Sequence, residues 1–558
     1  MLHALASGEN TSVLIVGGGP AGLVLAIELG QRGINCILVE QSHTTSNQPK
    51  ANLSSARTME HYRRLGFADE IRAVGLPPDY PQDVTFWTRY SAHELSRFKV
   101  PTSRQALAMP PEQRREWQTP ELTHRVQQMA FEPILKKKAE AHGNVSLRYG
   151  HRVTGFHEGD DDVDAIIENV STGATTSVRS RFLIGCDGSR SATRKKIGIE
   201  YHGQGSADRD FLGGKMLGLY FSCPRMYEII NGPPAWHYWT INNERRGLLV
   251  ALNGRDQFTL HIQMPPGTVL GEQLAKDWLK QVTGVEVPIE VLGLFEWTAG
   301  YTLVADRYRQ GRIFLAGDSA HLFTPAAGLG YNTSIEDVAN LAWKLAATIQ
   351  GWGGPELLES YERERRPIAL RNTEFARHTA DRLGSIPIRA ELEDDSAKGA
   401  DVRRSTGQII DDIVTKEFHI PGLILGTRYE HSPILMADPS PAPTNDFHVY
   451  QPSTHVGSRA PHIYLADGAP IFDRFGKGFT LLQFNPSAQG ADRLIKAAEI
   501  AGVPITLVQI SDEQARTLYE RDLVLIRPDQ HVCWRGNSVI DSPEDIIATV
   551  TGWSPATN

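Results

Sequence analysis

Three short motifs, far apart in the sequence, contain residue types that bind phosphates and hydroxyl groups. The first is the turn Gly17-x-Gly19-x-x-Gly22, with Ala21 before its last glycine, and it follows the apolar run 13–16. Gly17 permits a tight turn, Gly19 lets the backbone approach a pyrophosphate, and Gly22 allows a helix to pack closely on a strand. The N-terminus of that helix supplies free N–H groups and a favourable dipole. The turn therefore predicts a dinucleotide site.

A second apolar strand, residues 34–39, ends at Glu40. A carboxylate at this position can accept hydrogen bonds from the hydroxyl groups of an adenosine ribose, and its charge would repel a 2′-phosphate. Glu40 is therefore predicted to bind the same ligand as the glycine turn.

The other two motifs each place a carboxylate at the end of a buried strand. Asp187 follows the apolar run 182–186, and Asp318 follows the run 312–316. Ligands of parallel sheets cross the carboxyl ends of the strands, where such side chains can bind ligand hydroxyl groups. Asp187 could instead only cap the helix that follows it.

A glycine-rich turn at 328–332 follows Asp318 and leads into a long helix, predicted at about 333–350. Free N–H groups at a helix start can stabilise negative charge on a reduced flavin ring. Together the three motifs describe one extended ligand with phosphates and a ribityl chain. FAD fits this description.

The three motifs resemble those of the FAD-dependent aromatic hydroxylases, which are single-component flavoprotein monooxygenases. The resemblance lies in residues 13–22, 186–191 and 316–321, and residues 328–337 are similar to the phenol hydroxylase branch. It implies that NADH or NADPH reduces the flavin, and that dioxygen then forms a flavin 4a-hydroperoxide. The distal oxygen is transferred to an electron-rich ring, here expected to be that of a phenolic compound.

The same resemblance assigns further residues to the cofactor site. Gln128 matches a flavin contact, Lys50 stands where many relatives have an arginine, and Arg57 follows one helical stretch later. Pro325 is expected over the reactive flavin face. Gly330, Tyr331 and Asn332 are expected to direct backbone amides to the ring.

One departure concerns the activation of the substrate. Phenol hydroxylases have a carboxylate at the position of Asn52, and an amide cannot take the proton of a phenol at neutral pH. Another base is then expected, or a substrate that is already activated. His237 and Tyr238, in the aromatic stretch 236–239, are candidates, although a histidine among aromatic residues is commonly structural.

The expected fold is α/β: a Rossmann-like FAD-binding domain, an inserted substrate-binding β-sheet, and a C-terminal thioredoxin-like domain without a redox cysteine pair. The segment 103–118 is expected to be a loop, 386–405 irregular, and the C-terminal elements to follow the order β-α-β-β-α. The expected boundaries are 1–200 with 300–385 for FAD, 201–300 joined by 80–120 for the substrate sheet, 386–461 for a linker with connecting helices, and 462–558 for the last domain.

The composition of the chain limits which partners, metal sites and cellular compartments can be expected. The chain has 558 residues and a net charge of −8, so a nucleic-acid partner gains no support. Its four cysteines are far apart, with no C-x-x-C pair, which argues against a structural metal site and suits a reducing cytoplasm. We find no signal peptide and no apolar run long enough to span a membrane. We expect a cytoplasmic homodimer that binds a small aromatic molecule and dioxygen.

Three alternatives remain open. The same flavin chemistry could perform a Baeyer–Villiger or epoxidising oxygenation of a polycyclic ketone or aromatic compound. A pyridine nucleotide:disulfide reductase would require a redox cysteine pair and a second nucleotide fold, and neither is found. A non-catalytic flavin sensor is the third.

Overall fold

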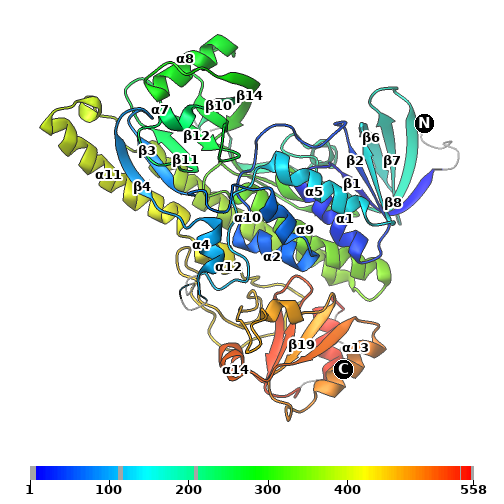
Figure 1. Cartoon of the computed structure of the whole chain (residues 1–558). Coiled ribbons are helices and arrows are strands. Elements are labelled where there is room, and N and C mark those ends of the chain that lie inside the picture. The colour runs from blue at the N-terminus through cyan, green and yellow to red at the C-terminus, as the bar shows by residue number, and fades with distance from the viewer. Residues whose placement is uncertain (1–7, 111–112, 114–116, 206–210, 541, 554–558) are drawn as a thin grey trace.

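A mostly parallel sheet lies at the upper right of Figure 1 in the computed structural model, which describes residues 8–110, 113, 117–205, 211–540 and 542–553. Its eight strands are β1 (Glu9–Val16), β2 (Cys36–Glu40), β5 (Val145–Tyr149), β6 (His151–Glu158), β7 (Val163–Asn169), β8 (Thr175–Gly185), β16 (Arg309–Gln310) and β17 (Ile313–Leu315). The order is β16-β17-β8-β1-β2-β5, and β7 joins β6 to β8. All three predicted motifs follow strands of this sheet, at the ends of β1, β8 and β17.

Helices cover this sheet, which explains why its central strands are apolar throughout. Val13, Leu14 and Ile15 of β1 are fully buried, as a parallel sheet covered on both faces requires. The helices of this domain are α1 (Pro20–Gln31), α2 (Ala56–Leu65), α3 (Ala68–Ala73), α5 (Gln128–Glu140), α6 (Ala192–Lys196), α9 (Leu329–Gln350) and α10 (Pro355–Gly384). Helix α9 begins before the predicted residue 333, because Gly328 takes the left-handed conformation of its N-cap, with a φ of 64°.

A second, seven-stranded sheet lies beside the first (Figure 1, upper left). Its strands are β3 (Val84–Trp87), β4 (Glu94–Phe98), β10 (Gly214–Ser222), β11 (His237–Thr240), β12 (Gly247–Ala251), β13 (Gln257–Gln263) and β14 (Glu290–Ala299). The order is β14-β10-β13-β12-β11-β3-β4, and only β3 and β11 pair in parallel. Helix α8 (Glu272–Thr283) packs on one face, where Val282 closely approaches Gly247.

Smaller elements connect these sheets. A three-stranded sheet of order β18-β15-β9 lies between them in the chain, and short helices flank the second sheet. These elements are β9 (Tyr201–Gln204), β15 (Thr302–Ala305), β18 (His321–Leu322), α4 (Ser103–Ala108), α7 (Met226–Ile229), η2 (Gly317–Ser319), η3 (Ala390–Glu393) and α12 (Pro421–Leu425). Helix α4 replaces part of the loop expected at 103–118, and it begins with a capping box formed by Thr102 and Gln105. Residues 111–112 and 114–116 of the expected loop lie outside the described residues.

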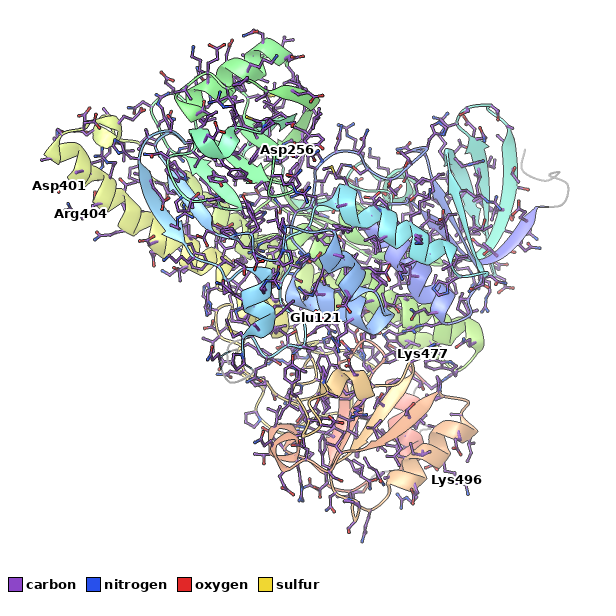
Figure 2. The ribbon with its side chains drawn as sticks, viewed as in Figure 1. Glu121, Asp256, Asp401, Arg404, Lys477 and Lys496 are labelled. Carbon is purple, nitrogen blue, oxygen red and sulfur yellow. The ribbon has the colours of Figure 1, made fainter. Side chains whose placement is uncertain are left out.

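The expectation of an irregular segment at 386–405 is wrong from residue 397 onward. Helix α11 (Ala397–Phe418) begins there, because the Ser396 hydroxyl caps it by accepting the Gly399 N–H. The helix extends along β4, and its Gly407 comes so close that a Cβ would lie 2.3 Å from the Leu95 carbonyl oxygen. Asp401 lies near the N-terminal end of this helix (Figure 2).

The C-terminal domain has the thioredoxin-like arrangement. Its elements are η4 (Ile471–Arg474), β19 (Phe479–Gln483), α13 (Ala491–Ile500), β20 (Ile505–Gln509), α14 (Glu513–Tyr519), β21 (Leu523–Ile526), β22 (Val532–Gly536) and α15 (Pro543–Val550). The sheet order is β20-β19-β21-β22, with β19 and β20 parallel. Helix α14 and strand β22 were not predicted. Cys533 is buried in the core and unpaired, as expected.

Buried charges join this domain to α9 and α10. The Arg527 guanidinium donates to both carboxylate oxygens of Glu364, at 2.6 and 2.8 Å, and to Asp529 at 2.6 Å. Lys344 of α9 donates to the same Glu364 at 2.7 Å. Burial raises the pKa of the Glu364 carboxyl, but the Arg527 and Lys344 cations outweigh burial and hold it at about 2. Within the described residues, no helix is long and apolar enough to cross a membrane.

We predict that Arg527→Met lowers the free energy of unfolding by about 3–5 kcal/mol, because it leaves the Glu364 and Asp529 carboxylates buried without their main partner. Urea unfolding of the purified holoenzyme measures the change. Arg404→Met is the control, since that arginine forms only an exposed ion pair on α11 (Figure 2), and a shift of at most about 0.5 kcal/mol is expected. Equal shifts for the two variants would contradict the prediction.

Candidate active site

The glycine turn after β1 is shaped by close backbone contacts. Gly17 has a φ of 109°, and a Cβ on it would lie 2.3 Å from the Cys186 carbonyl oxygen. A Cβ on Gly22 would lie 2.0 Å from the Gly17 carbonyl oxygen. At Gly19, by contrast, a Cβ would meet no heavy atom within 4 Å, and Gly19 is the N-cap of α1 without a side-chain cap. The first N–H groups of α1 therefore face open space that a pyrophosphate can fill.

Glu40 stabilises this turn from the end of β2. Its carboxylate accepts the Gly18 N–H and the Ser42 N–H, each at 2.8 Å. The side chain is half-buried, and each oxygen can accept a further hydrogen bond. Glu40 is thus held in place beside Ala21 and the glycine turn, as a ribose-binding carboxylate would be.

Asp187 caps the short helix α6. Its carboxylate accepts the Ser191 hydroxyl at 2.6 Å and the Thr193 N–H at 2.9 Å. Asp187 therefore makes the contacts of a capping carboxylate, and its role at the cofactor stays a prediction. The half-buried Asp187 orders the turn at the end of β8, next to the glycine turn.

Gly317 forms a turn with a φ of 65°. Asp337 of α9 holds this turn in place. The Asp337 carboxylate accepts the Gly317 N–H at 3.2 Å, His321 Nε2 at 2.6 Å and Arg365 Nε at 2.9 Å. Burial raises the pKa of Asp337, but His321 and Arg365 outweigh burial and lower it. Apart from its place in the third motif, no sequence pattern indicated Asp337.

Asp318 itself points into accessible space, and its carboxylate forms no hydrogen bond with the described residues. Protein nevertheless surrounds it on most sides, and this partial desolvation raises its pKa, an effect that His321 and Lys50 reduce. The side chain is therefore open to the hydroxyl groups of a bound ligand.

Lys50 and Gln128 lie together near the start of α5. Gln128 Nε2 donates to Glu132 at 2.7 Å, and the Gln128 N–H donates to the Ala51 carbonyl oxygen at 2.7 Å. Lys50 is exposed, and its positive charge lowers the pKa of both Glu132 and Asp318, which partly offsets the effect of burial. The structure therefore brings Lys50 and Gln128 to the side of the sheet where Asp318 lies.

The first turn of α9 has no side-chain cap, so its N–H groups are available to a ligand. The Asn332 side chain ties this turn to α2, because it accepts the Ser55 N–H at 2.8 Å and donates to the Leu53 carbonyl oxygen at 3.0 Å. The Tyr331 and Tyr62 hydroxyls are hydrogen-bonded to each other. Pro325 is exposed, and Gly330 is half-buried.

Arg57 lies elsewhere. Its guanidinium is buried against the C-terminal domain, where it donates to Glu60 at 2.8 Å, to Gln530 at 2.6 Å and to the Asp529 carbonyl oxygen at 2.7 Å. These partners assign it to the domain interface. We therefore do not carry Arg57 into the cofactor site.

The second sheet presents an aromatic face toward the FAD domain. Residues directly opposite one another on neighbouring strands point to the same face, so His237 and Trp239 of β11 share a face with their partners across the sheet. These partners include Val84, Phe86, Leu248, Val250, Thr259, His261, Gly218, Phe295, Met216 and Trp297.

Tyr238 points to the opposite face, toward α8, because neighbouring strand residues alternate. Its hydroxyl accepts the Ala235 N–H at 2.6 Å, and its ring packs edge-on against Tyr90. Burial raises its pKa. These contacts give Tyr238 a structural role and separate it from His237.

His237 is buried and stacks on Trp236 with ring centroids 3.4 Å apart. Neither ring nitrogen of His237 has a hydrogen-bond partner. Burial, and then the charges of Arg125 and His261, lower its pKa well below the usual value, so the ring is neutral at neutral pH. The Arg125 guanidinium lies over the Trp236 ring, with its Cζ 4.1 Å from the ring centroid. The sequence analysis missed Arg125, although it is a charged residue three positions before Gln128.

Asn52 is half-buried, and its backbone carbonyl accepts the Val126 N–H at 3.3 Å. Its side chain forms no hydrogen bond with the described residues. The next residue, Leu53, contacts Gly328, since a Cβ on that glycine would lie 3.3 Å from the Leu53 side chain. Asn52 thus lies between the start of α9 and the segment that carries Arg125.

The end of α11 connects the turn before α9 with the aromatic face. Glu417 accepts the Ala327 N–H at 3.1 Å, and Ala327 has an unusual φ of 54° for a residue with a side chain. Phe418 packs edge-on against Trp236, with ring centroids 6.3 Å apart. Burial raises the pKa of Glu417 to about 7, and the Ala327 N–H offsets only part of this effect. The sequence analysis missed Glu417.

Comparisons with known proteins agree with this geometry. The FAD binding domain family model matches residues 10–376, and the model of the C-terminal region of aromatic-ring hydroxylases matches residues 453–554. The chain belongs to the FAD-dependent aromatic-ring hydroxylases. It is 33% identical to the FAD-dependent monooxygenase apdD of Emericella nidulans, over 97% of this chain and 90% of that protein. It is 29% identical to a phenol 2-monooxygenase of Pseudomonas sp., over 97% of this chain and 92% of that protein.

Two solved structures are similar over nearly the whole chain. RebC, a rebeccamycin biosynthetic enzyme with reduced flavin, has a TM-score of 0.88 and 33% identity, with 98% of this chain and 99% of RebC covered. Aklavinone-11 hydroxylase with FAD and aklavinone has a TM-score of 0.81 and 26% identity, with 98% and 100% covered. Enzymes of this hydroxylase family bind FAD, and NAD(P)H reduces the flavin. The chain is therefore a flavoprotein aromatic monooxygenase.

We predict that Asp318→Ala weakens FAD binding by about 2 kcal/mol, because it removes a charged acceptor of ligand hydroxyl groups. The flavin content after desalting and the dissociation constant from flavin fluorescence measure the loss. Asp69→Ala, at an exposed position of α3, should leave both unchanged. An Asp318→Ala protein that is as yellow as the wild type would contradict this role.

Proposed function

We propose that this enzyme hydroxylates a phenolic aromatic compound with one atom of dioxygen, using FAD and NADH or NADPH. The observation that carries the proposal is the placement of the aromatic face around His237 beside the turn that leads into α9. The proposal places the aromatic ring of the substrate between the second sheet and the flavin.

FAD, when bound, accepts a hydride from NAD(P)H and activates dioxygen. In the proposed site the first amides of α1 and the side chain of Glu40 hold the adenosine and pyrophosphate. Asp318 binds the ribityl hydroxyls, with Lys50 and Gln128 close by. When FAD is bound, the amides of Gly330, Tyr331 and Asn332 would stabilise negative charge on the reduced ring, and Pro325 would lie close to it.

The residues around the substrate have distinct roles in this proposal. His237 is neutral and lacks protein partners, so it can hydrogen-bond a ring hydroxyl, but its lowered pKa makes it a weak base. Asn52 can orient the same substrate without taking its proton. Trp236 packs between the His237 ring and the Arg125 guanidinium and holds both side chains in place.

A Baeyer–Villiger or epoxidising oxygenation remains the second candidate. Its support is that one similar structure contains aklavinone, while a relative is named for phenol, so the family accepts substrates of different size. Both reactions use the same cofactor chemistry, and only the product separates them.

We expect a set of phenols and polycyclic phenols to include compounds that stimulate NADH or NADPH oxidation by the holoenzyme. With ¹⁸O₂, the product of such a compound should carry one labelled ring hydroxyl, detected by mass spectrometry. A labelled lactone or epoxide would instead support the second candidate. Reductant oxidation that yields only hydrogen peroxide with every compound would argue against both.

We also expect Glu417 to act as a positioning residue for the Pro325–Gly328 turn. Its ionised carboxylate is a stronger acceptor for the Ala327 N–H than its protonated form. Product formation by the wild type should therefore rise as the pH increases through about 7. Glu417→Gln keeps an acceptor oxygen but cannot titrate, so this inflection should disappear.

Asp412→Asn is the matched control for this pH profile. Asp412 lies on the same helix, but it is exposed and its Lys416 partner lowers its pKa. Its substitution should preserve the inflection near pH 7. An inflection that persists in Glu417→Gln would assign the titration to another group.

A further inference from the structure

Arg125 is a buried cation without a counter-charge. Its side chain lies within the fold at 5% exposure, and neither Nε nor Nη1 has a hydrogen-bond partner. No carboxylate among the described residues forms an ion pair with Arg125 or with the buried Arg194, whereas the buried Arg57, Arg365, Arg459 and Arg527 each have one. An isolated buried charge is strongly unfavourable, so such groups in proteins are paired or bind a ligand.

The polar groups around Arg125 are mainly donors without an acceptor. Trp236 lies under the guanidinium, and its indole Nε1 has no hydrogen-bond partner. The indole Nε1 of Trp239, three residues further along, also has no partner among the described residues, and the same holds for both nitrogens of His237. Indole and guanidinium nitrogens can only donate, and a neutral imidazole can donate from one nitrogen. This set requires an electron-rich acceptor, and an oxyanion satisfies it best.

The position of Arg125 connects this cluster to the proposed reaction. Its neighbour Val126 pairs with Asn52, and Gln128, the expected flavin contact, begins α5 three residues later. The guanidinium itself lies over Trp236, on the side of β11 that presents His237 and Trp239. A ligand bound by Arg125 would therefore lie between the aromatic face and the flavin site.

We propose that Arg125 binds an oxyanion of the aromatic substrate, so that the preferred substrate carries a carboxylate or a ring hydroxyl that is already ionised. This inference deepens the proposed function and depends on it for the location of the substrate. Burial lowers the pKa of Arg125 to about 9, so the guanidinium is still charged at neutral pH. The planar guanidinium suits the geometry of a carboxylate and can also bind a single phenolate oxygen. An ionised ring hydroxyl would also make the ring more electron-rich, which oxygen insertion requires.

The test compares matched anionic and neutral probes that differ little in shape. For the carboxylate, 2-naphthoate is compared with 2-naphthamide; for the hydroxyl, 4-nitrophenol above the pKa of its hydroxyl is compared with 4-nitroanisole. Equilibrium dialysis with the holoenzyme and the perturbation of flavin absorbance both give dissociation constants without turnover. We expect at least one anionic probe to bind about tenfold more tightly than its neutral partner, a difference of about 1.4 kcal/mol. Which pair shows the preference identifies the oxyanion.

Arg125→Gln should reduce this preference to about onefold, and Arg125→Lys should retain part of it, because lysine keeps the charge but loses the planar fork. Arg245→Gln is the matched control. Arg245 also lies over a tryptophan ring, Trp278, at 4.2 Å, but this ring belongs to α8 on the other face of the sheet. Arg245→Gln should keep the wild-type preference.

Equal affinities for both members of each pair in the wild type would overturn the inference, as would a failure of both anionic probes to bind. The wild-type comparison decides this even if Arg125→Gln does not fold. A preference that survives in a folded, flavin-loaded Arg125→Gln protein would also overturn it. In each of these cases the enzyme could still hydroxylate a neutral phenol, so the proposed function is tested separately by its labelled product.

Discussion

The site depends on how closely two helices approach the same edge of the parallel sheet. Helices α1 and α9 both begin there, and a Cβ on Gly317 would lie 3.4 Å from the Cβ of Ala21 and 3.0 Å from the Ser334 hydroxyl. Only glycine turns allow this approach, and Asp337 then fixes the second turn by accepting the Gly317 N–H. The result is two uncapped helix starts with their N–H groups side by side. An anionic, two-ended cofactor such as FAD complements this arrangement.

Much of this architecture is predictable from the sequence, because the relevant signals are local. The glycine turn, the apolar strands and Glu40 lie within one continuous stretch, and the physical reason for each residue type is a contact inside that stretch. The thioredoxin-like domain follows from its strand runs for the same reason. The local signal fails where a helix start depends on a single cap, as at Ser396 for α11 and Gly328 for α9.

The contacts that define the substrate site are not predictable in this way. Arg125, His237 and Phe418 are far apart in the sequence, and they pack around Trp236 only because three separate elements come together. Arg57 shows the opposite case. The family resemblance suggested a cofactor contact, but the C-terminal domain covers that part of α2, and its residues accept hydrogen bonds from the Arg57 guanidinium. Tertiary packing therefore decides whether a charged residue faces a ligand or an interface.

The C-terminal domain has no cysteine pair, yet its charges reach into the cofactor-binding body. Arg527 and Asp529 contact Glu364 of α10 and Asn340 of α9, and Lys344 of α9 completes the cluster. Helix α9, whose first turn is proposed to face the flavin, is thus anchored at mid-length by the C-terminal domain. A natural protein that lacked this domain would expose the charged side chains Lys344 of α9 and Glu364 of α10 to water. Lys344 and Glu364 would stay paired with each other in water, but Trp343 of α9, which packs against Phe479 of this domain, would lose its apolar cover.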